Sequence, residues 1–286
     1  KEQAMPVALA RLFTLSYIAL AWVFFRADTN EAALQLLSAL ANGLGTPEFQ
    51  HGLLAAFVFL SLNVEVDFLT RATPFIIEGI WITLAVSSAS IVLATLLAAL
   101  GALGRLSSNA VVNAIASFYV SFFRGTPLIL QLLVWYLALP QVGIILDPIF
   151  CAIGALGMNY GAYMTEIFRA GIQAVPLGQR EAAAALGMSG GTAFRRIIAP
   201  QAFRIIVPAI GNDFVAMLKD SALASTVALH EIVWRARNIG QKEFKTLQTF
   251  MIAGVVYWVL TIVFTAVQNR IEARLSAGDR NKATKG

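Results

Sequence analysis

The sequence predicts an all-α, polytopic membrane protein, because it combines long uncharged runs with few charged residues. Hydrophobic residues make up 58% of the chain and charged residues 13%, whereas soluble domains contain roughly 25% charged residues. Two runs contain no charge at all, Gly79 to Leu103 and Thr249 to Val267. At about 1.5 Å per residue the first is about 38 Å long, more than a hydrocarbon core of about 30 Å. We therefore expect both runs to cross a bilayer as helices.

Three further segments are apolar but interrupted. They are Ala110 to Leu139, which contains Arg124 and Pro127, Gly143 to about Phe168, and Ile205 to about Leu229. Together with the uncharged runs they give about five core transmembrane helices. The last two segments carry Asp147, Glu166, Asp213, Lys219 and Asp220. Charged groups at membrane depth usually face a bundle interior or a wet pathway.

The segment from Glu181 to Pro200, EAAAALGMSGGTAFRRIIAP, predicts a compact helix-turn-helix elbow. Strong helix formers precede Gly187, which is expected to end the first helix with a positive φ. Ser189 is then expected to cap a second helix that runs to a break or a new start at Pro200. We expect Glu181 to accept hydrogen bonds or to pair with Arg180 or Arg195.

The charges of the elbow predict its side of the membrane. Arg180, Arg195, Arg196 and Arg204 outnumber Glu181, and loops rich in Lys and Arg stay in the cytoplasm. The C-terminal tail is basic by the same measure and is also expected inside. Two crossings then separate elbow and tail, so the loop from Glu231 to Gln248 is expected outside, although it too is basic. A cytoplasmic elbow on a membrane protein is a surface for a partner.

The elbow resembles the E-A-A, three residues, G, nine residues, I-x-L-P signature of permease subunits of ATP-binding-cassette (ABC) importers. Ala199 replaces the usual Leu. Three further segments are similar to sequences of the branch of this family that imports polar amino acids. They are FFRGTPLILQL, TEIFRAGIQAVPLGQ and PQAFRIIVPAIGNDFVAMLKDSALAS. The resemblance covers about Val66 to Ser276. The residues in register, to which the resemblance assigns ATPase docking, are Glu181, Ala182, Ala183, Gly187, Ile197 and Pro200.

This resemblance implies a type I ABC importer transmembrane domain over residues 66–276, with a coupling elbow at 176–200 and a basic cytoplasmic tail at 277–286. It implies a permease of the bacterial inner membrane that imports amino acids by alternating access. The implied partners are ABC ATPase subunits, a second permease chain, identical or not, and an extracytoplasmic solute-binding protein. ATP and Mg²⁺ would be bound by the ATPase, with no cofactor on this chain. The sequence does not identify the amino acid.

The sequence contains no motif for catalysis or metal binding. No G-x-x-x-x-G-K-[ST] pattern occurs, so the chain cannot hydrolyse ATP by that route. Cys151 is the single cysteine, and His51 and His230 lack the close spacing of a metal-binding pair. The net charge of +5 lies in loops and the tail without a basic, aromatic-interleaved stripe, so nucleic acid is not an expected partner.

The predicted substrate pathway centres on Lys219, Asp220 and Ser221, because an amino acid carries both charges and needs partners of both kinds. Asp213 and Tyr163 are further candidates. The alternative is that Lys219 and Asp220 form an ion pair that only holds helices together. Glu166 and Arg169, spaced i and i+3, are expected to form a structural pair beside the elbow.

Residues 1–65 form a separate membrane segment of uncertain origin, with apolar runs at Leu12 to Phe25 and Leu53 to Leu62. They predict extra N-terminal apolar helices, either an anchor or a chimeric join. Residues 1 to about 50 resemble the C-terminal end of membrane-bound O-acyltransferases, and the remnant of such an enzyme is one alternative function. An ion-coupled secondary transporter is another, because carboxylates in the membrane also build ion sites. The elbow favours the importer, since neither alternative needs it.

Overall fold

The computed structural model describes residues 65–283, with side chains to residue 274. The chain divides into two compact units, Lys1–Glu65 and Val66–Gly286, and the following concerns the second. The predictions for the apolar runs at 12–25 and 53–62, for His51 and for the acyltransferase-like segment lie outside the described residues.

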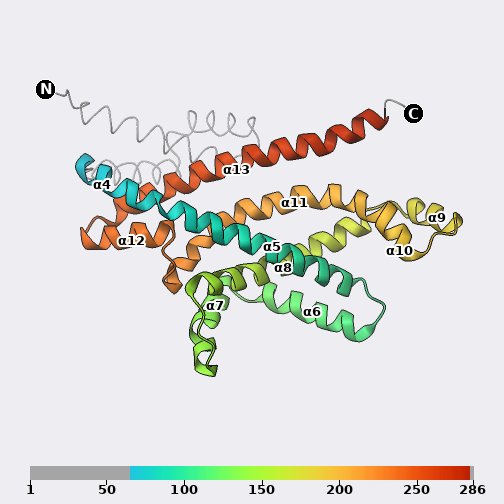
Figure 1. Cartoon of the computed structure of the whole chain (residues 1–286), viewed down its shortest axis with the longest axis horizontal. Coiled ribbons are helices and arrows are strands. Elements are labelled where there is room, and N and C mark those ends of the chain that lie inside the picture. Colours follow the sequence, from blue (N-terminus) through green and yellow to red (C-terminus); the bar gives the residue numbers. More distant parts are fainter. Residues whose placement is uncertain (1–64, 284–286) are drawn as a thin grey trace, which may run out of the picture. The chain divides into compact units, whose positions relative to one another are not determined.

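The second unit is a helical bundle, and its described residues contain no strand. The long helices are α4 (Val66–Ile77), α5 (Gly79–Arg105), α6 (Ala110–Gly125), α8 (Pro148–Gln173), α11 (Ala199–Asp220) and α13 (Thr246–Ala283). The shorter ones are α7 (Leu128–Leu133), α9 (Leu177–Ala185), α10 (Gly190–Ala193) and α12 (Ile232–Lys242). Helices α9 and α10 and the C-terminal end of α13 lie at one end of the bundle, and α4 and α12 lie at the other (Figure 1).

Helix α8 is the central helix, and its small residues explain its position. Gly154, Gly157 and Gly161 are buried and let neighbouring side chains approach its backbone. A Cβ on Gly157 would lie 2.6 Å from a Leu93 methyl group, and one on Gly161 would lie 2.6 Å from the Tyr119 hydroxyl. Such small-residue surfaces allow close helix packing inside membranes. The main hydrophobic core accordingly forms where α5, α8 and α11 meet.

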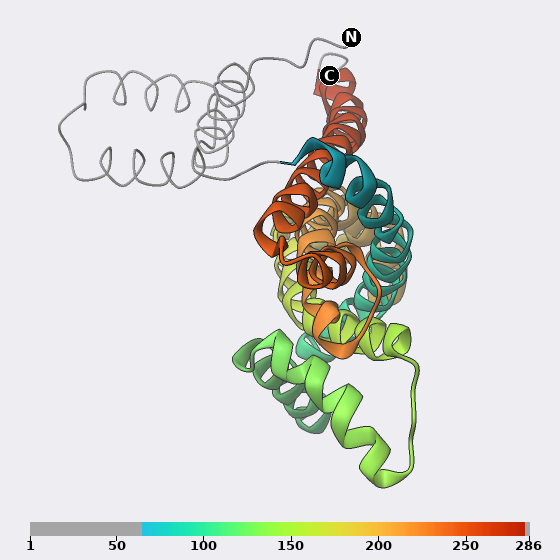
Figure 2. The ribbon, with the colours of Figure 1, turned by 90° about the vertical axis from the view of Figure 1, so that its left-hand side faces the viewer.

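The apolar helices confirm the predicted class. Three runs are long and apolar enough to cross a membrane, Val66–Arg105, Gly190–Val227 and Thr246–Arg274. The pair Ala110–Gly125 and Leu128–Val142 is apolar enough only when taken together, and it bends by 103° near Arg124 and Pro127, as a broken span or a re-entrant loop does. The green part of the chain after this bend projects from the bundle (Figure 2). Helix α8 has sufficient length, but its glycines, tyrosines and Asn159 make it less apolar because protein surrounds it.

The predicted break or new start at Pro200 is confirmed as a new start, because α11 begins at Ala199 with Pro200 in its first turn, although no non-helical residue precedes it. The helical run continues from Gly190 through Pro200 to Val227, so this span begins well before Ile205. The turn Phe194–Ile198 is π-helical, and the Ala199 N–H bonds to the Phe194 carbonyl five residues back. This wider turn precedes Pro200, which lies in the first turn of α11, where its missing N–H is tolerated.

Candidate functional site

The elbow between α8 and α11 begins with α9 and turns sharply at Gly187. Gly187 has a φ of 70°, which confirms the predicted positive φ. Its N–H bonds to the Ala184 carbonyl at 2.9 Å, and the Met188 N–H bonds to the Ala183 carbonyl at 3.0 Å. This is the hydrogen-bond pattern of a Schellman cap. Local sequence therefore closes α9 without help from the rest of the fold.

The second helix of the elbow starts at a capped serine. The Ser189 hydroxyl accepts a hydrogen bond of 3.4 Å from the Thr192 N–H and lies 2.9 Å from the Thr192 hydroxyl. This confirms Ser189 as the N-cap of α10. Because α10 runs through the π turn into α11, the elbow is continuous with a membrane span.

Two contacts fasten the elbow to the bundle. The Arg180 guanidinium donates a hydrogen bond of 2.7 Å to the Ile172 carbonyl in the last turn of α8, an arrangement that satisfies an otherwise unpaired helix carbonyl. Next to it a small apolar cluster joins the end of α8 to α11. Its buried members are Val175, Ile198, Ala202 and Ile206. A displacement of the elbow therefore reaches both α8 and α11.

The outer face of the elbow is exposed and partly apolar. Leu186 is 79% exposed and Leu177 67% exposed, so both ends of α9 carry an exposed leucine. Glu181 is exposed and has no hydrogen bond or ion pair within the described residues. The expected pairing of Glu181 with Arg180 is wrong, because Arg180 turns back to α8. The face thus offers leucines and an uncommitted carboxylate.

The six residues to which the resemblance assigned ATPase docking divide by exposure. Four are exposed, Ile197 is half-buried, and Ala183 is buried at the base of α9. The exposed ones are Glu181, Ala182, Gly187 and Pro200. Ala183 therefore supports the elbow from inside, while the exposed four are accessible to another molecule.

The predicted pathway residues near the end of α11 do not form the expected group. Asp220 accepts a hydrogen bond of 2.7 Å from the Tyr160 hydroxyl of α8. Lys219 is exposed and makes no ion pair within residues 65–274. Ser221 is buried, and its hydroxyl donates to the Leu218 carbonyl at 2.7 Å. The alternative of a Lys219–Asp220 ion pair is therefore wrong, because neighbouring residues on a helix point in different directions.

The other two pathway candidates lie elsewhere. Tyr163 is partly exposed on α8, and the Arg124 guanidinium lies 5.1 Å from its ring centroid. Asp213 lies in the middle of α11, and its Oδ2 is buried without a hydrogen-bond partner. A carboxylate oxygen left unpaired among helices is costly unless water or a ligand reaches it.

The sequence prediction missed the polar contacts that hold the 103° bend after α6. Gln131 Nε2 donates to the Phe123 carbonyl at 3.0 Å and to the Thr126 hydroxyl at 2.8 Å. Asn159 Nδ2, on α8, donates to the same Phe123 carbonyl at 3.0 Å and to Gln131 Oε1 at 3.2 Å. The carbonyls freed by the break are thus satisfied by side chains, as the membrane interior requires. Pro127 predicted a break in the helix. The side chains that bind the freed carbonyls, above all Asn159, lie too far along the sequence to be predicted as partners.

The sequence prediction also missed Glu231, which was assigned to an outer loop. The structure buries this side chain completely and uses it to cap α12, with hydrogen bonds of 2.9 Å from the Val233 N–H and 2.7 Å from the Trp234 N–H. The Tyr257 hydroxyl donates a third at 2.7 Å. Glu231 lies between the spans Gly190–Val227 and Thr246–Arg274. Burial raises the pKa of its carboxyl to about 7, although these three donors and Arg237 oppose the rise.

Comparison with known proteins identifies the family. Residues 90–277 match the model of the protein family described as binding-protein-dependent transport system inner membrane component. The chain belongs to this family. It is 37% identical to the arginine transport system permease protein ArtQ of Bacillus subtilis over 76% of its length and all of that protein. It is also 37% identical to the histidine/lysine/arginine/ornithine transport system permease protein HisQ of Escherichia coli, over 71% of this chain and 94% of HisQ.

Solved structures agree with this assignment. A crystal structure of an amino acid ABC transporter with histidines matches with a TM-score of 0.71 and 36% identity, over 74% of this chain and 100% of that one. An inward-facing structure of the MetNI methionine ABC transporter shares the fold, with a TM-score of 0.58 at 20% identity over 70% of this chain and 96% of that one. The chain is therefore a multi-pass ABC importer permease, a translocation subunit. The acyltransferase resemblance of residues 1 to about 50 has no support in these comparisons.

Proposed function

We propose that this permease forms the translocation pathway of an ATP-driven amino acid importer, and that a separate ATPase docks on the elbow. The observation that carries the proposal is the elbow itself: an exposed face with leucines and the free Glu181, fastened to two long helices. A docked ATPase would cover the exposed Leu177 and Leu186 and could contact Glu181. The chain has no phosphate-binding loop of its own, so its energy comes from the partner, which binds ATP and Mg²⁺.

Movement of the elbow drives the alternating access of the pathway. Two ATPase subunits that close on ATP would push the elbows of two permease chains, whether identical or sister chains. The Schellman turn, the Arg180–Ile172 bond and the apolar cluster around Ile198 make each elbow move with α8 and α11. Displacement of these helices alternates the pathway between inward-open and outward-open states.

We propose an orientation in which the elbow and α12, which lie at opposite ends of the bundle (Figure 1), are on opposite sides of the membrane. With the elbow and C-terminus in the cytoplasm of a bacterium, α12 faces outward, where a solute-binding protein would deliver substrate. The two arginines of α12 do not oppose this orientation, because other groups of the fold bind them. Arg235 pairs with Glu78 at 2.6 Å, and Arg237 donates to the Ser225 carbonyl at 2.7 Å.

The proposed substrate class is an amino acid, in keeping with the names of the relatives. Among the pathway candidates, Asp220 is the one to which we assign the amino group. Its carboxylate is exposed yet oriented by Tyr160, a combination suited to binding a cation. Tyr163, Asp213, Lys219 and Ser221 remain further proposed pathway residues, although they do not form one group with Asp220.

The experiment that tests this function is reconstitution of the permease with its ATPase in liposomes. We expect ATP hydrolysis and uptake of a radiolabelled cationic amino acid that both require the solute-binding protein. Uptake driven by an ion gradient without the ATPase would contradict the proposal.

A further inference from the structure

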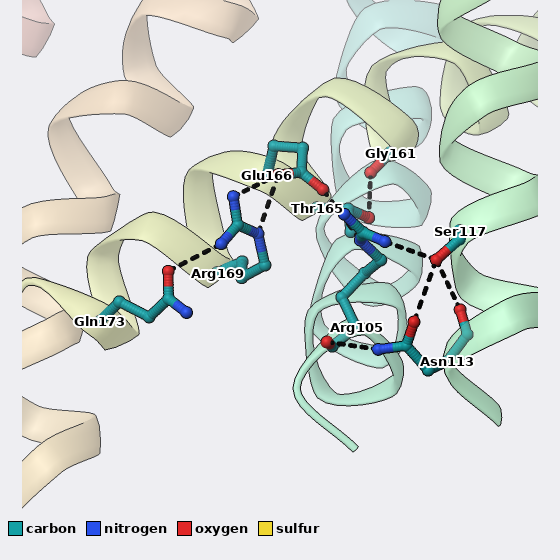
Figure 3. Close-up of polar contacts among 8 residues, drawn as sticks. All are labelled: Arg105, Asn113, Ser117, Gly161, Thr165, Glu166, Arg169 and Gln173. Carbon is teal, nitrogen blue, oxygen red and sulfur yellow. Dashed lines mark hydrogen bonds and ion pairs between the residues drawn. The ribbon is translucent and has the colours of Figure 1, made fainter. Parts of the chain in front are cut away.

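One carboxylate near the elbow is shared between two helices. Glu166 lies on α8, and its Oε1 accepts a hydrogen bond of 3.2 Å from Nε of Arg105, the last residue of α5. Its Oε2 pairs with Arg169, one turn further along α8, at 2.7 Å. Figure 3 shows the carboxylate between the two guanidinium groups. The expected pair of Glu166 and Arg169 is thus confirmed, but it is half of a larger arrangement.

The Arg105 side joins three helices. The Arg105 guanidinium also donates to the Ser117 hydroxyl of α6, and Asn113 Nδ2 donates to the Arg105 carbonyl at 2.8 Å. Ser117 in turn donates to the Asn113 carbonyl at 2.7 Å. These contacts hold α5 and α6 together near the turn between them and orient the Arg105 side chain toward α8 (Figure 3). Within the described residues, the Arg105–Glu166 ion pair joins α5 to α8.

The Arg169 side stays within one helix. Besides Glu166, Arg169 bonds to Gln173 at 2.7 Å, in the last turn of α8. The two guanidinium groups thus share one carboxylate and are equally exposed, at 30% each, but only Arg105 reaches another helix. This asymmetry provides a matched comparison between the two arginines.

The inner half of α6 has few other attachments. Its side chains Val111, Ile115 and Phe118 are exposed, and only Ala116 and Val120 of this helix are buried. The outer half of α6 has its own bonds to α8, from Tyr119 to the Met158 carbonyl at 2.8 Å and from Asn159 to the Phe123 carbonyl. Near the elbow, polar attachment of the hairpin to α8 depends on Arg105 and Glu166.

We propose that Glu166 is a positioning residue that makes the inner end of the α5–α6 hairpin follow the elbow. This inference rests on the proposed function. When the ATPase displaces the elbow, α8 moves because Arg180 and the apolar cluster join them. Helix α5 already packs along α8, so the role of the Glu166–Arg105 pair is to hold the inner end of α5 and, through Ser117, to pass the displacement to α6. Without the pair, the ATPase would still dock and hydrolyse ATP, but the hairpin would lag and fewer cycles would move substrate.

The test compares Arg105→Gln with Arg169→Gln in the reconstituted complex. Each variant removes one guanidinium from the same carboxylate, but only Arg105→Gln breaks the link between helices. We measure ATP hydrolysed per substrate imported. We expect this ratio to rise about fivefold in Arg105→Gln and in Glu166→Gln, the size of change seen when coupling between sites is lost. In Arg169→Gln it should stay within about twofold, and Arg105→Lys should retain most of the coupling.

A distance measurement separates coupling from general damage. Spin labels are placed at Ser108→Cys in the α5–α6 turn and at Ala174→Cys, where α8 ends just before the elbow, with Cys151→Ala to remove the native thiol. Both labelled positions are exposed. Addition of ATP and vanadate should leave the distance distribution unchanged in the otherwise unaltered complex and should shift or broaden it in Arg105→Gln.

Three results bear against the inference. Equal coupling in Arg105→Gln and Arg169→Gln would overturn it, as would a hairpin-to-elbow distance that changes in the unaltered complex. If Arg105→Gln fails to fold, Ser117→Ala keeps the Arg105–Glu166 pair and removes the Arg105 bond to α6 together with the Ser117 bonds to Asn113 within α6. Normal coupling with an unchanged distance distribution in that variant would also overturn the inference. A complex without mutations whose ATP hydrolysis is unrelated to uptake would instead contradict the proposed function.

Discussion

The Tyr160 hydroxyl on α8 donates a hydrogen bond of 2.7 Å to Asp220 at the end of α11. The carboxylate is therefore oriented by a neutral donor on another helix, and Lys219 beside it in the sequence takes no part. A neutral donor leaves the negative charge available to a ligand, whereas a lysine would neutralise it.

We expect Asp220→Asn to reduce uptake about tenfold while basal ATP hydrolysis falls less than twofold, because a hydrogen bond to a charged group contributes about 1.5–3 kcal/mol. Uptake and ATPase rates are measured on the same liposomes. Tyr160→Phe is the control, since it removes the orienting bond but keeps the charge, and its loss should be smaller. Equal loss of both activities in Asp220→Asn would indicate a purely structural role.

Gly187→Asp should abolish transport and weaken ATPase association while the protein still inserts. The backbone φ of 70° is accessible to Asp and Asn, and no atom lies within 4 Å of an added Cβ. The defect should therefore come from the new charge on the docking face. Gly187→Asn tests this directly, and we expect it to retain most ATPase binding in a pull-down. Similar losses in both variants would mean that shape or backbone, and not charge, matters there.

Gln131→Leu should destabilise the bend after α6. The substitution removes donors to the Thr126 hydroxyl and carbonyl and half of the bonding to the Phe123 carbonyl. Loss of a buried polar partner costs about 1–3 kcal/mol. Thermal unfolding in detergent should show the loss, and Gln141→Leu, at an exposed site on the projecting segment, serves as the control. An unchanged midpoint for Gln131→Leu would contradict the role assigned to this side chain.

Stability should depend on pH through Glu231. Burial raises the pKa of its carboxyl in the folded protein to about 7 from the ordinary 4.5, so the folded state binds more protons than the unfolded state between these values. Stability contributed by this group is present below about pH 4.5 and is lost as the pH rises to about 7. Melting temperatures across pH 5 to 8 should show this decline, and Glu231→Gln should flatten it. An equally steep decline in the variant would assign the pH dependence to other groups.

Local features of the fold were predictable, because they depend on neighbouring residues. Gly187 was predicted to end one helix and Ser189 to cap the next, and the uncharged run from Gly79 indicated the start of α5. Pro200 correctly indicated the start of α11, but no local signal predicted the π turn that joins α10 to α11 without a break.

The partners of polar residues were harder to predict, because the fold brings them together from distant positions. Tyr160 and Asp220 are separated by 60 residues in the sequence, and Arg105 and Glu166 by 61. The sequence indicated that Glu166 and Asp220 face a bundle interior or a wet pathway, but only the arrangement of α5, α8 and α11 selects their partners. Glu231 was assigned to a polar loop because its burial depends on α13, which supplies Tyr257.

The docking of an ATPase on the elbow is the central claim, and Glu181→Lys tests it most directly. Glu181 is exposed and has no partner within the described residues. The substitution should therefore change the free energy of unfolding by about 0.5 kcal/mol or less and leave the melting temperature of the permease nearly unchanged. The measurement is the amount of ATPase that co-purifies with the permease. We predict that the unaltered chain retains ATPase and that Glu181→Lys loses most of it with an unchanged melting temperature. Full retention of the ATPase by Glu181→Lys and by Gly187→Asp would contradict the claim.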